Sequence, residues 1–253
     1  AQIDTGCPAL IIVDESYVLD LSDINSTVVA TPDTRHAKAV VSAAFYDYPA
    51  EKLKMVGVTG SKGKTTVATM ITAALREAGK KAASIGSNGV NLGDEILEVA
   101  NTTPDSDQMQ KFLSIMVSKG IEYAVLECSS QGLMQHRTDM INFDIGVFLN
   151  VQYGDHVGTD EHPTFDNYAY CKSLLLQQCD KGIINLDDEH IDFIVKDATC
   201  ELITIGHEGV HEKTEKLGTT PDYVISDQHT KESNGFIGEE FKLSGKIDDT
   251  VFV

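Results

Sequence analysis

Three things are scarce in this sequence of 253 residues: basic side chains, long apolar runs and paired cysteines. Its 20 Lys and Arg face 39 Asp and Glu, and the net charge of −19 argues against a general surface for nucleic acid or anionic membranes. No apolar run is long enough to span a bilayer, and the first residues lack the basic-then-apolar pattern of a signal peptide. The five cysteines form no CxxC pair and no metal-type spacing with histidine, which is typical of reduced thiols. These absences predict a soluble cytoplasmic protein that binds any anionic ligand through a local set of donors.

The middle of the chain alternates between strand-like and helix-like patterns, and the length suffices for one large domain with a full core. The expected strands are residues 54–59, 82–86, 123–128, 145–150, 182–185 and 201–205. The expected helices are residues 64–78, 106–118, 165–178 and 189–198. Such alternation is typical of right-handed βαβ units. We therefore predict an α/β fold with a mostly parallel sheet flanked by helices.

The two ends of the chain show different patterns. Before residue 50 there are two short apolar runs and one helical pattern, at residues 9–14, 26–31 and 33–46. We interpret residues 1–49 as the end of a preceding domain and residues 50–253 as the main domain. From Asp222 onward, short alternating runs at residues 223–226, 236–243 and 250–253 predict a small antiparallel appendage.

The strongest local signal is a segment rich in glycine and lysine between an expected buried strand and an expected helix. It reads Thr-Gly-Ser-Lys-Gly-Lys-Thr-Thr from residue 59 to residue 66. Gly60 and Gly63 allow a tight turn that directs N–H groups inward, and the N-terminus of the next helix favours negative charge. In such a motif Lys64 reaches the β- and γ-phosphates, and Thr65 offers its hydroxyl to Mg²⁺. The segment predicts a phosphate loop, although Val58 stands where the general motif has glycine.

Polar residues end two of the expected buried strands. Glu127 ends one, and Asn150 ends the next, shortly before Asp155 and His156. Because ligands of open parallel sheets bind beyond the carboxyl ends of the strands, these side chains are candidates for a site. Glu127 offers oxygen ligands of the kind that Mg²⁺ prefers. A lone loop histidine such as His156 can equally be a structural hydrogen-bonding residue.

A lysine lies on the apolar face of the helix expected at residues 165–178. Lys172 follows Tyr168 by four residues and precedes Leu175 and Leu176 by three and four. Burial favours the neutral amine, which is nucleophilic and can take up CO₂ to become a metal-binding carbamate. The alternative is a lysine that extends its ammonium group to water.

Together these motifs resemble the Mur ligase family, and within it the MurE type, which adds the third amino acid to the UDP-linked cell-wall peptide. The resemblance covers roughly residues 52–205. Besides the phosphate loop it rests on residues 101–104, residues 127–137, Asn150 with Asp155-His156, and residues 168–172. Five ordered motifs are far more specific than one phosphate loop. The resemblance implies that residues 1–49 end a UDP-binding domain and that residues 50–253 form an incomplete central ATP-binding domain without the family's third domain.

The resemblance also implies a reaction and a set of roles. ATP would phosphorylate the terminal carboxylate of UDP-MurNAc-L-Ala-D-Glu, and a diamino acid would attack the acyl phosphate to form an amide. The nucleotide would be bound by Gly60, Ser61, Lys62, Gly63, Lys64, Thr65, Thr66 and Asn150, and the UDP-MurNAc-dipeptide by Asn101, Thr102, Thr103, Ser129, Gln135 and Arg137. One Mg²⁺ would be held by Thr65 and Glu127, and a second by His156 and carbamylated Lys172. Lys64, Glu127, His156 and Lys172 would be catalytic, because ATP and a carboxylate repel one another unless cations screen them.

Two departures from the family pattern concern the surroundings of Lys172. Residues 157–167 form a slightly longer stretch than usual, and Cys171 replaces a small residue. Both affect the expected geometry of the lysine rather than the family assignment.

Other functions remain open at the level of sequence. A folylpolyglutamate or cyanophycin synthetase would share the phosphate loop, but residues 101–104 and 129–137 favour a muramyl-peptide ligase. A non-catalytic ATP-binding module would not need Glu127, His156 and Lys172. We also expect the chain to be a monomeric fragment that binds nucleotide without forming the amide. The sequence does not choose between diaminopimelate and lysine as the added amino acid.

Overall fold

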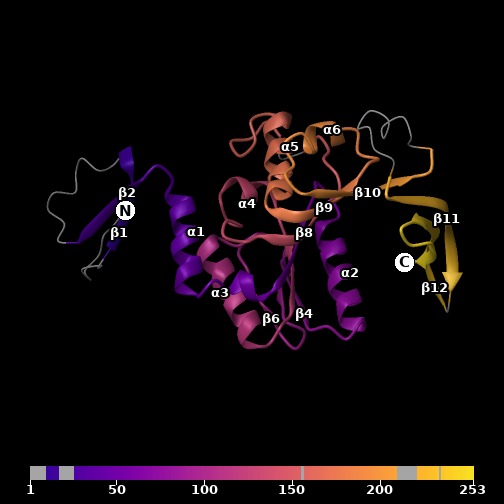
Figure 1. Cartoon of the computed structure of the whole chain (residues 1–253), viewed down its shortest axis with the longest axis horizontal. Helices are drawn as coiled ribbons and strands as arrows, with labels where there is room; N and C mark the ends of the chain where they lie inside the picture. The colour runs from indigo at the N-terminus through magenta and orange to yellow at the C-terminus, as the bar shows by residue number, and fades with distance from the viewer. Residues whose placement is uncertain (1–9, 17–25, 155–156, 210–220, 234) are drawn as a thin grey trace.

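The computed structural model describes residues 10–16, 26–154, 157–209, 221–233 and 235–253 (Figure 1). Most of these residues build one sheet of eleven strands, in the order β13-β12-β11-β10-β9-β8-β3-β7-β4-β5-β6. Its central strands are β3 Lys54–Thr59, β4 Ala82–Gly86, β7 Tyr123–Glu127, β8 Phe143–Phe148, β9 Cys179–Asn185 and β10 Glu201–His207. These six strands are parallel, with β3 between β7 and β8, which confirms the predicted α/β class.

Helices cover both faces of this parallel region. They are α2 Lys64–Glu77, α3 Ser106–Ser118, α4 Ser130–Met134, α5 Phe165–Ser173, the 3₁₀ turn η3 Leu174–Gln177 and α6 Ile191–Ile194. On one face, Ile71 and Leu75 of α2 pack against Val56, Val58 and Val125. On the other face, buried residues of α3 and η3 join Met55 and Phe143 in the larger core. The alternation of Met55 and Val56 between the two cores follows from the two-residue period of a strand.

Two predicted helices differ from the structure. The helix expected at 165–178 changes to a 3₁₀ turn after Ser173, whose hydroxyl bonds back to the Tyr170 carbonyl at 2.8 Å. The prediction of a helix at 189–198 was wrong in its bounds, because only Ile191–Ile194 is helical. The Asp188 carboxylate accepts from the backbone N–H groups of His190 and Val151, and these bonds hold the chain in a turn before that helix.

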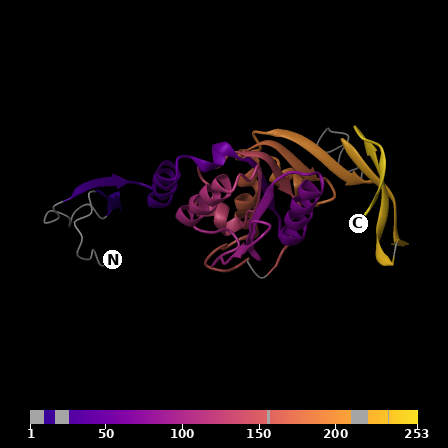
Figure 2. The same ribbon diagram turned by 90° about the horizontal axis from the view of Figure 1, so that it is seen from below.

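The N-terminal part of the described chain projects from the central sheet. The strands β1 Leu10–Asp14 and β2 Thr27–Thr31 form a separate parallel pair, and α1 Thr34–Phe45 and the turn η2 Pro49–Lys52 follow. Asp33 caps α1 by accepting the N–H groups of Arg35 and His36. The pair β1–β2 lies at one end of the elongated molecule (Figure 2). Helix α1 connects it to the central region beside α3 (Figure 1).

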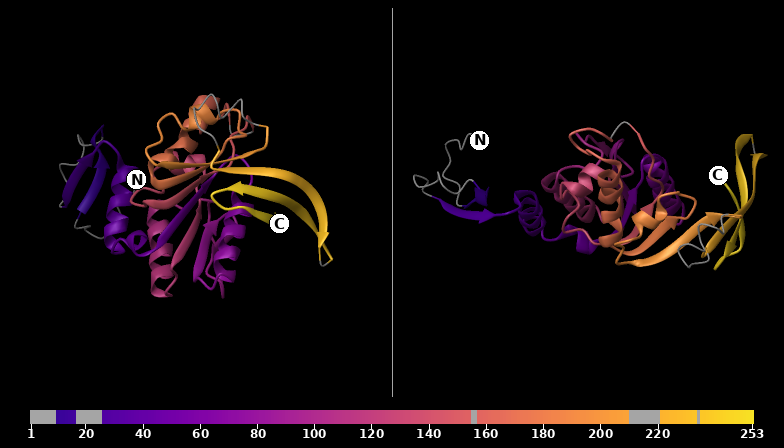
Figure 3. Two further views of the ribbon diagram at one scale, coloured as in Figure 1. Left: turned by 45° about the vertical axis from the view of Figure 1, so that its right-hand side comes forward. Right: turned by 90° about the horizontal axis from the view of Figure 1, so that it is seen from above.

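The C-terminal strands form the antiparallel appendage that the sequence predicts. They are β11 Tyr223–Ser233, β12 Phe236–Gly245 and β13 Asp249–Phe252. All pairs among them are antiparallel, whereas β11 joins the central sheet by a parallel pairing with β10. β11 and β12 extend beyond the predicted bounds, whereas β13 begins and ends one residue before its predicted segment. The ribbon of β11–β13 projects away from the helices (Figure 3).

Two further elements lay outside the predictions. Short strands β5 Gly89–Asn91 and β6 Ile96–Leu97 form an antiparallel edge next to β4.

No helix within the described ranges is long and apolar enough to cross a membrane.

Candidate active site

The phosphate loop lies between β3 and α2, where the sequence predicts it. Gly63 precedes α2 with φ +87, a left-handed conformation that favours glycine. Asn150 shapes the loop from the end of the neighbouring strand. Its carbonyl accepts the Ser61 N–H at 2.9 Å, its Oδ1 accepts the Lys62 N–H at 3.0 Å, and its Nδ2 donates to the Lys62 carbonyl at 3.2 Å. The side chains of Lys62 and Thr66 are exposed.

Glu127 meets the first turn of α2 at the carboxyl end of β7. Its Oε2 accepts the Thr65 hydroxyl at 2.8 Å, and its Oε1 accepts the Ser87 N–H at 3.0 Å. Glu127 is 3% exposed, so the carboxylate has a fixed position. A Cβ on Gly86 would lie 1.9 Å from Glu127 Oε1, and only glycine leaves room for this carboxylate. A hydroxyl and a carboxylate in contact are hard oxygen donors that fit Mg²⁺.

Two lysines from different elements converge on one carbonyl. The ammonium groups of Lys64 and Lys172 donate to the Gly60 carbonyl at 2.8 and 3.0 Å. Burial lowers the pKa of Lys172 to about 7, and the nearby positive charge of Lys64 acts in the same direction. The face of the Tyr168 ring, 4.4 Å from Lys172 Nζ, favours the protonated form and opposes this shift.

Lys172 does not extend to water, since the residue is only 1% exposed. The same helix is tied to the phosphate loop by the Tyr168 hydroxyl, which donates to Ser61 Oγ at 3.1 Å. Burial also lowers the pKa of Lys64. The hydrogen bonds to the Gly60 carbonyl and to Ser61 Oγ fix the positions of both lysines relative to the phosphate loop.

A polar pocket of about 210 Å³ lies next to these lysines. Its lining residues are Lys64, Asn101, Thr102, Thr103, Ser129, Ser130, Gln131, Arg137, Glu161, Tyr168 and Lys172. Small-molecule pockets usually exceed roughly 300 Å³, so this space suits reacting groups rather than a whole nucleotide. Five of the six residues predicted for the muramyl peptide line it. The sixth, Gln135, lines a neighbouring pocket that also contains Arg137.

Hydrogen bonds order the side of this pocket where the sequence predicts the muramyl peptide. Thr103 Oγ1 donates to the Glu127 carbonyl at 2.8 Å and accepts the Ser129 N–H at 2.9 Å. Arg137 donates to the Thr103 carbonyl at 2.9 Å and to Gln135 Oε1 at 2.7 Å. Arg137 also forms an ion pair with Asp105 at 3.1 Å. An anionic ligand of Arg137 would therefore compete with a carboxylate that is already in place.

One buried histidine of this region escaped the sequence reasoning. His162 Nε2 lies 2.9 Å from Ser130 Oγ, and its Nδ1 lies 2.9 Å from Asn167 Oδ1. The contact connects residues 157–167, the stretch that differs from the usual family pattern, to the start of α4. His156 and Asp155 lie outside the described residues, so the expected position of His156 beside Lys172 stays a prediction.

The parallel sheet with its loop between β3 and α2 defines a phosphate-loop α/β protein. Residues 58–247 match the sequence profile of the Mur ligase middle domain. The chain belongs to this family, as the motifs predict.

Two curated relatives bear the name of a diaminopimelate ligase. The chain is 42% identical over 182 residues to UDP-N-acetylmuramoyl-L-alanyl-D-glutamate–2,6-diaminopimelate ligase 1 of Clostridium acetobutylicum, covering 72% of this chain and 37% of that protein. It is 37% identical over 243 residues to ligase 2 of the same organism, covering 94% of this chain and 47% of that protein. The chain thus spans less than half the length of these relatives.

Solved structures agree on the fold. A structure of UDP-N-acetylmuramoyl-L-alanyl-D-glutamate–2,6-diaminopimelate ligase matches with a TM-score of 0.73 and 26% identity, covering 89% of this chain and 44% of that chain. MurF from Acinetobacter baumannii matches with a TM-score of 0.62 and 18% identity, covering 91% of this chain and 45% of that chain. The second likeness, at this identity, concerns the fold alone.

Proposed function

We propose that this chain is the ATP-binding part of a ligase that adds the third amino acid to UDP-MurNAc-L-Ala-D-Glu in peptidoglycan synthesis. One observation carries the proposal: a single pocket is lined by Lys64 of the phosphate loop, by buried Lys172 and by most of the predicted muramyl-peptide residues. A reaction between a terminal phosphate and a carboxylate requires this meeting of two sites. A protein that only binds nucleotide has no need for the muramyl-peptide residues in the same pocket.

The proposed reaction proceeds through an acyl phosphate. The substrate carboxylate would attack the γ-phosphate of ATP, ADP would leave, and the amine of the amino acid would then displace phosphate from the acyl carbon. In this chain, Lys64 and the loop N–H groups would hold the phosphates, while Thr65 and Glu127 would hold Mg²⁺. When bound, Mg²⁺ would neutralise charge on the transferring group. Arg137 would position an anionic group of the dipeptide.

Lys172 would act as a carbamate. Its amine has a pKa of about 7, so a large neutral fraction is present at neutral pH. The nitrogen would attack CO₂, a C–N bond would form, and one proton would pass to solvent, leaving an anion beside Lys64. His156 would share a second Mg²⁺ with this anion. Incubating the protein with ¹³CO₂ and recording ¹³C NMR tests the step: a carbamate signal that Lys172→Met removes is expected, and its persistence in that variant would exclude Lys172.

The same proposal includes the incoming amino acid, the oligomeric state and the cellular compartment. The curated relatives are named diaminopimelate ligases, which supports diaminopimelate rather than lysine as the incoming amino acid. We propose a cytoplasmic monomer that meets UDP-MurNAc-dipeptide, ATP and this diamino acid, and no nucleic acid or membrane.

The substrate side is tested by calorimetric titration with UDP-MurNAc-L-Ala-D-Glu in the presence of Mg²⁺ and AMPPCP. Arg137→Ala removes a charged hydrogen-bonding group at the pocket and should weaken dipeptide binding by roughly tenfold or more. Lys181→Ala, which removes the same charge from the surface, is the matched control. Equal affinities for wild type and Arg137→Ala would contradict the proposed substrate site.

A further inference from the structure

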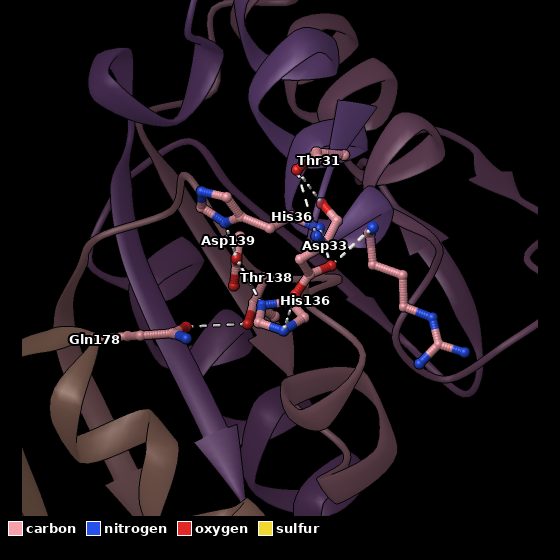
Figure 4. Close-up of polar contacts among 8 residues, drawn as sticks. Thr31, Asp33, His36, His136, Thr138, Asp139 and Gln178 are labelled. Carbon is pink, nitrogen blue, oxygen red and sulfur yellow. Dashed lines mark hydrogen bonds and ion pairs between the residues drawn. The ribbon is translucent and has the colours of Figure 1, made fainter. Parts of the chain in front are cut away.

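A second cluster of polar side chains lies where α1 meets the loop after α4 (Figure 4). His36 of α1 and His136 of the loop both direct Nδ1 at Asp139 Oδ2, at 2.6 and 2.8 Å. The three atoms lie within 4.8 Å of one another, although His36 and Asp139 are 103 residues apart in the chain. We propose that His36, His136 and Asp139 bind a divalent transition-metal cation of the Zn²⁺ class.

Each ring nitrogen of His136 faces a carboxylate oxygen. His136 Nε2 lies 3.0 Å from Asp33 Oδ2, while Nδ1 faces Asp139. A neutral imidazole has one N–H, so donation to Asp33 leaves a Nδ1 lone pair directed at a carboxylate oxygen. A proton or a metal ion between Nδ1 and Asp139 removes this repulsion.

Asp33 gives the site the outer support that metal-binding histidines usually have. One Asp33 oxygen caps α1 by accepting the N–H groups of Arg35 and His36, and the other faces His136 Nε2. A carboxylate that accepts the second ring N–H fixes the tautomer and the orientation of a ligating imidazole. The helix cap and the histidine orientation thus depend on one side chain.

The loop presents its two ligands from a constrained backbone. His136 and Met140 have φ values of +58 and +64, a region that residues other than glycine rarely adopt. Thr138 between them is buried, and its hydroxyl donates to Gln178 Oε1 at 3.0 Å. The loop backbone that carries His136 and Asp139 is therefore constrained, and half-exposed His36 is the ligand with the most freedom to adjust.

The present distances are those of hydrogen bonds, and a metal requires a small opening. Zinc bonds of about 2.0–2.2 Å in a tetrahedral arrangement separate ligand atoms by about 3.3 Å. A rotation of the His36 side chain lengthens its 2.6 Å distance to Asp139, and a smaller rotation of the His136 or Asp139 side chain lengthens their 2.8 Å distance, without a change in the loop backbone. Two imidazoles and one carboxylate favour Zn²⁺, Co²⁺ or Ni²⁺ over Mg²⁺ and Ca²⁺, which prefer oxygen ligands alone.

A bound cation would join α1 to the loop that carries Gln135 and Arg137. Both of these residues line the pocket that Arg35 and Lys38 of α1 also line. The cation site would therefore fix the N-terminal helix against the candidate substrate site, without taking part in the Mg²⁺ chemistry of the phosphate loop.

The first experiment needs no variant. Co²⁺ is titrated into the metal-free chain and its visible absorption is recorded, with Zn²⁺ added afterwards as competitor. We expect absorption bands of a low-coordinate Co²⁺ site with histidine ligands, saturating at one ion per chain and lost on addition of Zn²⁺. A spectrum unchanged from that of free Co²⁺ would overturn the proposal.

Variants assign the site to these residues by Zn²⁺ calorimetry. Asp33→Asn keeps a good helix cap but removes the charge behind His136, and should weaken Zn²⁺ binding by roughly 10–100-fold. His36→Ala should weaken it at least as much. His207→Ala is the control, since His207 also pairs with a carboxylate, that of Asp187, but belongs to no group of metal-type ligands among the residues that the structure describes. Equal Zn²⁺ affinity in His36→Ala and wild type, with both chains folded by circular dichroism, would also overturn the assignment.

Discussion

The parallel centre and the β11–β13 ribbon belong to one sheet but differ in what their side chains contact. In β3 and β7 nearly every residue is buried, because helices cover both faces. In the ribbon every residue is at least partly exposed, and Ile237 is 78% exposed. The ribbon is an extension held mainly by backbone pairing, whereas the centre is held by packing on two sides.

This difference explains where the candidate site lies. Glu127, Asn150 and the phosphate loop all follow strands that are fixed from both faces, so their side chains converge with little freedom. The ribbon contributes none of the residues that line the pocket beside Lys64 and Lys172. The packing of helices on both faces of the sheet, rather than strand pairing alone, positions the side chains of the candidate site.

The largest difference between the regions should appear in core truncation. Leu126 of β7 is fully buried, and Leu126→Ala should lower the free energy of unfolding by about 2–5 kcal/mol, through lost burial and the cavity left behind. Urea unfolding followed by circular dichroism measures this change. A loss below about 1 kcal/mol would mean that the centre is packed no better than the ribbon.

A buried lysine within the centre should make stability depend on pH. Below about pH 7 Lys172 is protonated in the folded and unfolded chain, so the cost of its buried charge is fully present. As pH rises from about 7 towards the ordinary value of 10.5, the folded amine is neutral while the unfolded one stays protonated, and folding becomes more favourable.

Lys172→Met removes this dependence. In CO₂-free buffer it should raise the free energy of unfolding by on the order of a few kcal/mol at about pH 6, and by less at about pH 9. Paired urea titrations of wild type and variant at the two pH values measure the difference. A stability gain that is equal at both values would show that Lys172 keeps its ordinary pKa.

Steric tolerance should also separate tightly packed positions from open ones. Gly86→Ala places a Cβ 1.9 Å from Glu127 Oε1, and should cost about 1–3 kcal/mol while displacing a candidate Mg²⁺ ligand. In the control Gly154→Ala, the new Cβ meets no atom within 4 Å among the described residues. Thermal unfolding with and without Mg²⁺ and AMPPCP should show that only the Gly86 variant loses stability and loses the stabilisation by ligand.

The smallest effect is expected in the ribbon itself. Ile237→Ala removes an exposed side chain of β12, and should change the free energy of unfolding by less than about 0.5 kcal/mol. The same urea assay as for Leu126→Ala measures it. A loss of about 2 kcal/mol would show that the ribbon is packed against another part of the protein in solution.

The sequence predicted those features that depend on local patterns. The phosphate loop combines turn glycines with a strand and a helix, and α3 has the predicted bounds 106–118. Helical spacing also placed Lys172 on an apolar face with Tyr168 and Leu175, but left open whether its ammonium group extends to water. Each of these signals lies within about fifteen neighbouring residues.

Features that depend on distant partners escaped prediction. Gly86 is an ordinary strand residue until Glu127, 41 positions later in the sequence, fills the space of its missing Cβ. The His162–Ser130 contact and the His36–Asp139 contact likewise join segments that only the fold brings together. The short strands β5 and β6 have too few residues to show the two-residue alternation of apolar and polar side chains that identifies a strand.

We propose that the phosphate loop of this chain binds Mg²⁺ with a nucleotide through Lys64. The most direct measurement is calorimetric titration of Mg²⁺-AMPPCP into wild type, Lys64→Ala and the surface control Lys181→Ala. We expect similar affinities for wild type and Lys181→Ala, and a loss of roughly a hundredfold or more for Lys64→Ala, because a charged hydrogen bond to phosphate disappears from a partly buried site. Equal affinity of wild type and Lys64→Ala would contradict the claim.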